Sequence, residues 1–217
     1  MAKPANFADQ RERMVERQLR ARGIDDERVL EAMGSVPREA FVPEEVRGHA
    51  YDDSALPIGH EQTISQPWVV AAICQALALA GTERVLEIGT GSGYSTAVLA
   101  RLAGEVVSVE RIPELGERAR EQLRELGVTN AEVIVADGSQ GHPGEPYDAI
   151  AVHAATPEAP HSLLAQLGDE GRLVVPIATG SVDMLTLFER GPDGMRQQSI
   201  GPCRFVPLIG TEGFSER

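Results

Sequence analysis

The chain has 217 residues, 42% of them hydrophobic, and carries 33 acidic against 20 basic side chains, for a formal net charge of −13. Contacts from Lys and Arg to phosphates supply most of the affinity for nucleic acids, so this charge argues against a nucleic-acid partner. No apolar run approaches the roughly 18 residues that a membrane span needs, and residues 1–13 lack the apolar core of a signal peptide. We therefore expect a soluble, cytoplasmic protein that forms one domain over residues 1–217.

The N-terminal part of the chain is expected to be helical and then irregular. A helix is predicted over residues 7–22, where apolar side chains recur on one side and Gly23 ends the pattern. A shorter helix is predicted between Asp25 and Pro37. Several Pro and Gly residues interrupt residues 41–64, which predicts an irregular segment wrapped over the body of the protein.

From Pro67 onward the sequence alternates between helices and strands. The first helix is mostly apolar, and further helices are predicted over residues 113–126 and 157–167. The predicted strands cover residues 84–88, 105–110, 132–136, 147–152 and 172–177. This alternation predicts an α/β, Rossmann-like doubly wound fold, with a mostly parallel sheet and helices on both faces.

The C-terminal part breaks this alternation. The stretches DMLTLFER, MRQQSI and CRFVPLIG all read as strands, and no helix separates them. We therefore predict one or more antiparallel strands at the C-terminal edge of the sheet. The expected domain then has three parts: N-terminal helices and a substrate-side loop (1–66), a cofactor-binding core (67–180) and C-terminal strands (181–217).

A glycine-rich turn follows the first strand of the predicted core, with the sequence Glu87-Ile88-Gly89-Thr90-Gly91-Ser92-Gly93. Glycines at this place let the backbone turn tightly and let a ligand approach it closely. The spacing is Gly-x-Gly-x-Gly, not the Gly-x-Gly-x-x-Gly of dinucleotide binders. A carboxylate at position 87 would repel a pyrophosphate but would tolerate a cationic sulfonium or amino group.

Two further strand ends extend this candidate site. Glu110 ends the second strand, about 20 residues after the turn, where a carboxylate can accept hydrogen bonds from two ribose hydroxyls. Asp137 and Gly138 follow the third strand, where they can face an adenine. Because the carboxyl ends of parallel strands share one edge, these residues predict a cofactor site along that edge.

These motifs resemble those of the Rossmann-like S-adenosylmethionine-dependent methyltransferases. VLEIGTGSGY resembles the first motif of that class, SVE the second and VADG the third. The resemblance implies S-adenosyl-L-methionine as cofactor. The expected cofactor-binding residues are Thr63, Glu87, Gly89, Thr90, Gly91, Gly93, Glu110, Arg111, Asp137 and Gly138.

The methyl acceptor is predicted to be a carboxylate. Enzymes that methylate conjugated amines often carry Asn/Asp-Pro-Pro-aromatic after the fourth strand, where this chain reads VHAATP. A carboxylate is already ionised near pH 7 and needs donors and not a general base. The hydroxyls of Thr63 and Ser65 and the N–H groups at the start of the next helix are candidate donors. Ser65 also fits the pattern of a helix cap, so both interpretations stay open here.

Three segments resemble the protein-L-isoaspartate O-methyltransferase family, namely YDDSALPIG with QTISQP, VHAATPEAP, and RFVPLIG. The match runs from about residue 10 to residue 214. It implies methylation of the α-carboxylate of L-isoaspartyl residues in damaged proteins or peptides, as a repair reaction. It also implies Ser65 as the active residue, to which we assign a positioning role. The expected substrate-binding residues are Ile58, Thr63, Ser65, Val206, Pro207 and Leu208.

Two other functions remain open: methylation of a normal Asp in a dedicated peptide, and a non-catalytic module that binds isoaspartyl residues. Asp53 is expected to hold loop backbone, while Glu61 and Trp68 depart from the family pattern. We expect no metal, because the five histidines lack ligand spacing and are typical of surface or loop positions. They are His49, His60, His142, His153 and His161. Cys74 and Cys203 are expected to be buried free thiols.

Overall fold

The computed structural model describes residues 6–144 and 146–216. The helices are α1 (Phe7–Met14), α2 (Glu27–Ser35), α3 (Pro67–Leu77), α4 (Tyr94–Leu102), α5 (Pro113–Glu125) and α6 (His161–Ala165). The strands are β1 (Leu56–Gly59), β2 (Gln62–Ile64), β3 (Arg84–Ile88), β4 (Glu105–Glu110), β5 (Ala131–Val135), β6 (Tyr147–Val152), β7 (Leu167–Ala178), β8 (Asp183–Gly191) and β9 (Gly194–Cys203). Four short helical turns complete the described elements: η1 (Val15–Leu19), η2 (Arg20–Arg22), η3 (Arg38–Phe41) and η4 (Glu44–His49).

A seven-stranded sheet forms the centre of the molecule, in the order β5-β4-β3-β6-β7-β8-β9. The five strands from β5 to β7 run parallel. Strand β8 is antiparallel to β7, and β9 is antiparallel to β8. The predicted α/β fold with antiparallel strands at its C-terminal edge is confirmed.

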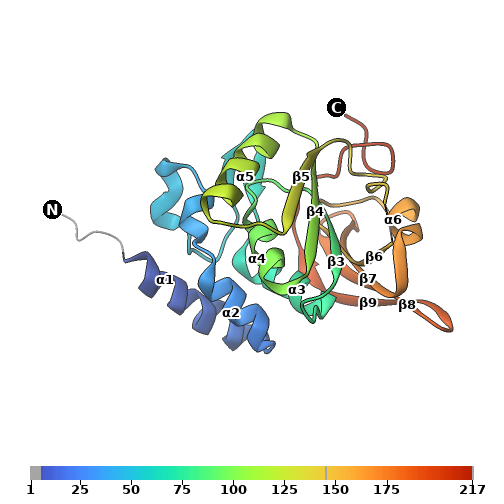
Figure 1. Cartoon of the computed structure of the whole chain (residues 1–217), viewed down its shortest axis with the longest axis horizontal. Helices are drawn as coiled ribbons and strands as arrows, with labels where there is room; N and C mark the ends of the chain where they lie inside the picture. The colour runs from blue at the N-terminus through green and yellow to red at the C-terminus, as the bar shows by residue number, and fades with distance from the viewer. Residues whose placement is uncertain (1–5, 145, 217) are drawn as a thin grey trace.

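Helices lie on both faces of this sheet, with α3, α4 and α5 on one face and the short helix α6 on the other (Figure 1). Along β3, Val85 packs into the cluster shared with α3 and α4, whereas its neighbour Leu86 packs into the cluster shared with α6. Helix α3 is apolar nearly all round because it lies between the sheet and the N-terminal helices. Within the described ranges, no helix has both the length and the apolar character needed to cross a membrane.

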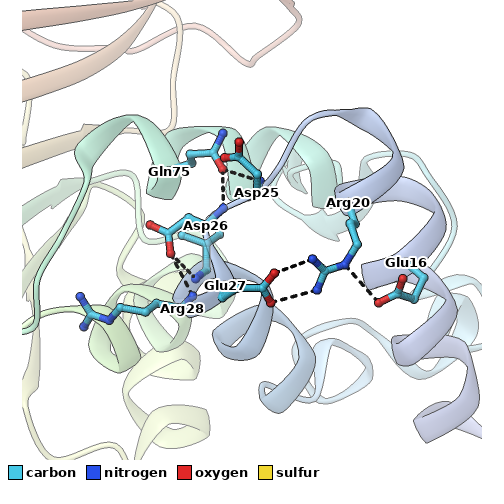
Figure 2. A network of polar contacts seen from close by, with 8 residues as sticks. Glu16, Arg20, Asp25, Asp26, Glu27, Arg28 and Gln75 are labelled. Carbon is cyan, nitrogen blue, oxygen red and sulfur yellow. Dashed lines mark hydrogen bonds and ion pairs between the residues drawn. The ribbon is translucent and has the colours of Figure 1, made fainter.

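The predicted helix over residues 7–22 is a continuous helical run that changes its hydrogen-bond pattern from α to π to 3₁₀. It ends at Gly23, whose φ of 89° is left-handed. The next segment is anchored on α3 by Gln75, whose Oε1 accepts from the backbone N–H groups of Asp25 at 2.8 Å and Asp26 at 3.0 Å (Figure 2). Figure 2 also shows Arg20 between Glu16 and Glu27 on the outer surface.

Gln75→Ala should lower the free energy of unfolding by about 1 kcal/mol, because the half-buried N–H group of Asp26 loses its acceptor, whereas the exposed N–H group of Asp25 can bind water instead. Arg20→Ala is the contrasting variant, since the Arg20 side chain is 43% exposed and its partner Glu27 is 72% exposed. Exposed ion pairs contribute little, so we expect a change below about 0.5 kcal/mol. Urea unfolding measures both, and a larger loss for Arg20→Ala would contradict this assignment.

Two predicted elements, the segment 41–64 and the helix over residues 157–167, were wrong in detail. The segment 41–64 is largely regular: it contains η4 and a hairpin of β1 and β2, because left-handed backbone at Gly59, His60 and Glu61 closes a tight turn. The helix predicted over residues 157–167 forms only as α6, because residues 167 onward join β7.

The C-terminal strands also differ from the prediction. MRQQSI and the start of CRFVPLIG belong to the single strand β9, which ends at Cys203. The following residues do not continue the sheet, because they turn back across the end of β6, where Pro207 forms an isolated bridge with Ala155. Both thiols are free, and Cys74 is buried as expected, but Cys203 is only half-buried.

Candidate active site

A pocket with about 830 Å³ of free space, open to solvent, lies at the carboxyl ends of β3 and β6. Strands β3 and β6 are paired, but the chain continues from β3 toward β4 on one side and from β6 toward β7 on the other. The two connections therefore diverge and leave a crevice at the carboxyl ends of these strands. Most of the predicted site residues line this pocket. They are Thr63, Ser65, Gly89, Thr90, Gly91, Glu110, Arg111, Gly138, Val206, Pro207 and Leu208.

The glycine-rich loop (residues 89–93) forms one wall of the pocket. Its three glycines have φ values of 90°, 56° and 88°, which L residues with side chains rarely adopt. At Gly93 a Cβ would also lie 3.2 Å from the Cβ of Ala119 on α5, so the loop sits directly on that helix. The bare backbone at Gly89 and Gly91 leaves room for a ligand to approach closely.

Glu110 connects this loop to the end of β4. Its Oε2 accepts from the N–H of Gly91 at 2.8 Å, and its Oε1 accepts from the N–H of Ile112 at 2.9 Å. The residue is 6% exposed and faces the pocket. Each carboxylate oxygen has a further lone pair, so Glu110 is held in place to accept from a pair of hydroxyls.

Glu87 lies beneath the loop and does not line the pocket. It is fully buried, and its oxygens accept from the hydroxyls of Ser95 at 2.5 Å, Thr96 at 2.5 Å and Ser108 at 2.6 Å. Nε2 of His153 is 3.3 Å from Glu87 Oε1, but it lacks the alignment of a hydrogen bond. Burial alone would raise the pKa of Glu87, yet His153 and the hydroxyls together hold it below its ordinary value. The geometry therefore supports a role in shaping the loop from below.

Glu87→Gln should lower the free energy of unfolding at neutral pH by about 2 kcal/mol, because the buried hydroxyls lose a charged acceptor. A carboxyl whose pKa is lower in the folded than in the unfolded state contributes stability above its unfolded pKa and loses it as pH falls. The difference in free energy of unfolding between the wild type and Glu87→Gln should therefore shrink as the pH drops below 4.5, the ordinary pKa of Glu. Urea unfolding of both proteins at a series of pH values around 4.5 measures this difference. A difference that does not change with pH would contradict the prediction.

Ser65 does not cap helix α3. The capping position is Gln66, and no side chain there accepts from the helix. Among the described residues the Ser65 hydroxyl has no hydrogen-bond partner, and the residue lines the pocket beside Thr63. The structure thus leaves this hydroxyl available to a ligand.

Four predicted site residues do not line this pocket: Ile58, Glu87, Gly93 and Asp137. Ile58 packs under the glycine-rich loop, where a Cβ on Gly91 would be 3.5 Å from its Cδ1. Asp137 instead accepts from the N–H groups of Ser139 at 2.9 Å and Thr211 at 3.3 Å, so it secures the C-terminal segment.

The flanking residues singled out in the sequence, Asp53, Glu61 and Trp68, do not line this pocket. Asp53 pairs with Arg22 at 2.8 Å and accepts from the Gln66 side chain at 2.7 Å, so its carboxylate holds two side chains. The expectation that it holds loop backbone was wrong, because no backbone N–H of the described residues donates to this carboxylate. Trp68 lies against Arg22, with the guanidinium 5.1 Å from a ring centroid. Glu61 is exposed in the hairpin turn.

His153 lies in the loop that directly follows β6, so the expected loop position is correct, but it is not at the surface. Its side chain is only 6% exposed, because it lies between Glu87 and Phe205 and lines the pocket. The signal was its position directly after β6, the strand beside β3 at the crevice. The described ranges contain no group of three or more His, Cys, Asp or Glu residues that could hold a metal ion.

The fold and the site together define a class of protein. A mostly parallel sheet carries a Gly-x-Gly-x-Gly turn after β3 and a carboxylate that faces the same pocket from the end of β4. This combination is that of the Rossmann-like S-adenosylmethionine-dependent methyltransferases, and the open glycine backbone and Glu110 fit that cofactor.

Comparisons with known proteins refine this class. The model of the protein-L-isoaspartate(D-aspartate) O-methyltransferase family matches residues 9–213. The chain is 54% identical over 213 residues to protein-L-isoaspartate O-methyltransferase 1 of Rhodopseudomonas palustris, covering 97% of this chain and 87% of that protein. It is 53% identical over 210 residues to the protein of the same name from Syntrophobacter fumaroxidans, covering 96% and 98%.

Two solved structures agree with this result. One is a protein-L-isoaspartate O-methyltransferase with a TM-score of 0.80 and 30% identity, over 93% of this chain and 66% of that chain. The other is a proposed protein-L-isoaspartate O-methyltransferase from Plasmodium falciparum in complex with S-adenosyl-L-homocysteine, with a TM-score of 0.80, 25% identity, and 94% and 99% coverage. The chain belongs to the protein-L-isoaspartate(D-aspartate) O-methyltransferase family, and the predictions of this family and of its cofactor are confirmed.

Proposed function

We propose that this chain repairs damaged proteins by moving a methyl group from S-adenosyl-L-methionine to the α-carboxylate of an L-isoaspartyl residue. The observation that carries this proposal is the free hydroxyl of Ser65 in the same pocket as the glycine-rich loop and Glu110. A donor for an anion then lies beside a site for the cofactor. The family resemblance implies that the methyl ester cyclises to a succinimide, which reopens partly to normal aspartate.

We assign the pocket residues by their chemistry. Glu110 accepts from the ribose hydroxyls, and the backbone at Gly89 and Gly91 lets the cofactor approach closely. On the acceptor side, Thr63 and Ser65 donate to the carboxylate of the substrate. Three residues of the C-terminal segment, Val206, Pro207 and Leu208, line the same pocket as Ser65 and contact the peptide there.

The reaction needs positioning and not proton removal. The cofactor supplies an activated methyl group, and the acceptor is a carboxylate that is already ionised near pH 7. One carboxylate oxygen bonds to the methyl carbon as the carbon–sulfur bond breaks, and the electron pair of that bond stays on sulfur. Ser65 and Thr63 hold the carboxylate in line with the bond that breaks.

Radiolabelled S-adenosyl-L-methionine should label a peptide that contains L-isoaspartate and leave its normal aspartyl twin unlabelled. Transfer to the aspartyl peptide alone would favour methylation of a normal Asp, and cofactor binding without transfer to either peptide would favour a binding module. Both of those outcomes would refute the repair function.

We also infer that the chain acts in the cytoplasm as one catalytic domain without a nucleic-acid partner. The net charge of −13 supports the last of these inferences, because phosphate backbones would be repelled over much of the surface. A gel-shift measurement at low salt with duplex and single-stranded DNA and RNA tests it, and binding in the micromolar range would contradict it.

A further inference from the structure

We propose that Arg38 positions Ser65 and supplies a buried positive charge that favours the acceptor carboxylate. This inference rests on the proposed function. Arg38 lies in η3, outside the glycine-rich loop and outside the residues that line the pocket. It would act through Ser65 and through the electric field in the acceptor half of the site, and we therefore treat it as a positioning residue.

The contacts of Arg38 join three parts of the site. The side chain is fully buried, its Nε donates to the carbonyl of Ala50 at 2.7 Å, and its Nη2 donates to the carbonyl of Ser65 at 2.7 Å. Its guanidinium also lies 4.9 Å from the ring centroid of Tyr94, the first residue of α4, which lines the pocket. One side chain thus fixes the backbone that presents the Ser65 hydroxyl and ties it to the cofactor side.

The charge on Arg38 is not neutralised by an ion pair. No carboxylate of the described residues lies within ion-pair distance of it, and its buried Nη1 has no hydrogen-bond partner. Burial lowers the pKa of Arg38 to about 10, so the guanidinium is still charged near pH 7. A buried cation without a counter-ion is costly, and a neutral donor could have served the two carbonyls.

The adjacent carboxylate does not compensate this charge either. Glu39 accepts from the Tyr51 hydroxyl and pairs with Arg11 at 3.0 Å. Arg11 also donates to the Tyr51 hydroxyl at 2.7 Å. The Glu39 carboxylate is therefore satisfied by Arg11 and Tyr51, whereas Arg38 contacts two carbonyls and the Tyr94 ring and has no carboxylate partner among the described residues. In a protein of net charge −13, this buried cation makes the acceptor half of the pocket locally more favourable for an anion.

Arg38→Met removes the charge and the donors and should raise the KM for an isoaspartyl peptide about 10-fold or more, while Kd for S-adenosyl-L-homocysteine changes less than about threefold. Arg38→Lys keeps the charge and one donor direction, so its peptide KM should lie between those of wild type and Arg38→Met. Steady-state kinetics measure KM and kcat, and calorimetry measures Kd. An unchanged peptide KM in Arg38→Met would overturn the proposal.

Arg190→Met is the matched control. Arg190 is a half-buried arginine on β8 that donates to the carbonyl of Leu164 at 2.6 Å and has an unpartnered buried Nε, but it does not line the pocket. Arg190→Met removes a guanidinium group, as Arg38→Met does, and the KM of this variant for the peptide should stay at the wild-type value. An equal rise of KM in both variants would show a general loss of stability and would overturn the proposal.

If Arg38→Met does not fold, Arg38→Gln is compared with Arg38→Lys to test the role of the charge. Gln keeps a donor without the charge, so Arg38→Lys should have the lower peptide KM of the two. A lower KM for Arg38→Gln, or loss of S-adenosyl-L-homocysteine binding in both variants, would show a structural role only. The wild-type chain is assayed first: failure to methylate the isoaspartyl peptide refutes the proposed function, whereas an active wild type with unaltered Arg38 variants refutes only this inference.

Discussion

Ser65→Ala should lower kcat/KM for an isoaspartyl peptide about 100-fold, because loss of the donor lets the acceptor carboxylate leave the line of attack. The affinity for S-adenosyl-L-homocysteine should not change, since the cofactor half of the pocket keeps its contacts. The free energy of unfolding should change by less than about 0.5 kcal/mol, because the hydroxyl has no partner in the structure and does not cap α3. Peptide kinetics, calorimetry and urea unfolding measure these three quantities.

Ser54→Ala is the control for this variant. Ser54 lies in the same substrate-side segment, is exposed and does not line the pocket, so its removal should leave kcat/KM unchanged. If Ser65→Ala kept wild-type kcat/KM, the positioning role would be refuted. If it lost stability in place of activity, Ser65 would be a structural residue after all.

Glu110→Ala should weaken the binding of S-adenosyl-L-homocysteine about 100-fold, equivalent to the loss of two charge-assisted hydrogen bonds of about 1.5 kcal/mol each. The carboxylate acts twice in this site. It holds the N–H groups of Gly91 and Ile112, and it presents its remaining lone pairs to the ligand. Glu110→Gln retains one acceptor oxygen, so we expect an intermediate loss of about 10-fold.

Glu105→Ala separates this effect from a general weakening of β4. Glu105 begins the same strand, is exposed, and pairs with Arg84 at 3.2 Å at the edge of the sheet remote from the pocket. Its replacement should leave the calorimetric Kd at the wild-type value. Tight binding by a folded Glu110→Ala protein would show that another group recognises the ligand.

The strands of the core could be predicted closely from the sequence. The predicted bounds of β3, β4 and β6 agree with the structure, because each is a short apolar run between polar or glycine positions. The hairpin of β1 and β2 was missed because its turn has left-handed backbone at His60 and Glu61, which are not typical turn residues for that conformation. The C-terminal segment after Cys203 was wrongly predicted as a strand from its apolar residues. In the structure these residues line the pocket and do not pack on a face of the sheet.

Some residues of the candidate site could likewise be predicted from the sequence, and others could not. The glycine-rich loop and Glu110 could be found by spacing, because a parallel sheet brings the ends of successive strands to one edge. His153 and Arg38 could not be found in this way. The place of His153 in the site depends on which strand lies beside β3. The role of Arg38 depends on two carbonyls that are 12 and 27 residues away in the chain.

By itself the sequence determined the fold class, the cofactor edge and the family, because periodic apolar patterns and local motifs carry that information over short distances. Only the tertiary structure decided what the buried polar groups do. It placed Glu87 on three hydroxyls beneath the loop and left the hydroxyl of Ser65 free in the pocket. The physical reason is that a buried polar group takes its role from the partners that folding brings to it, and most of those partners are distant in sequence.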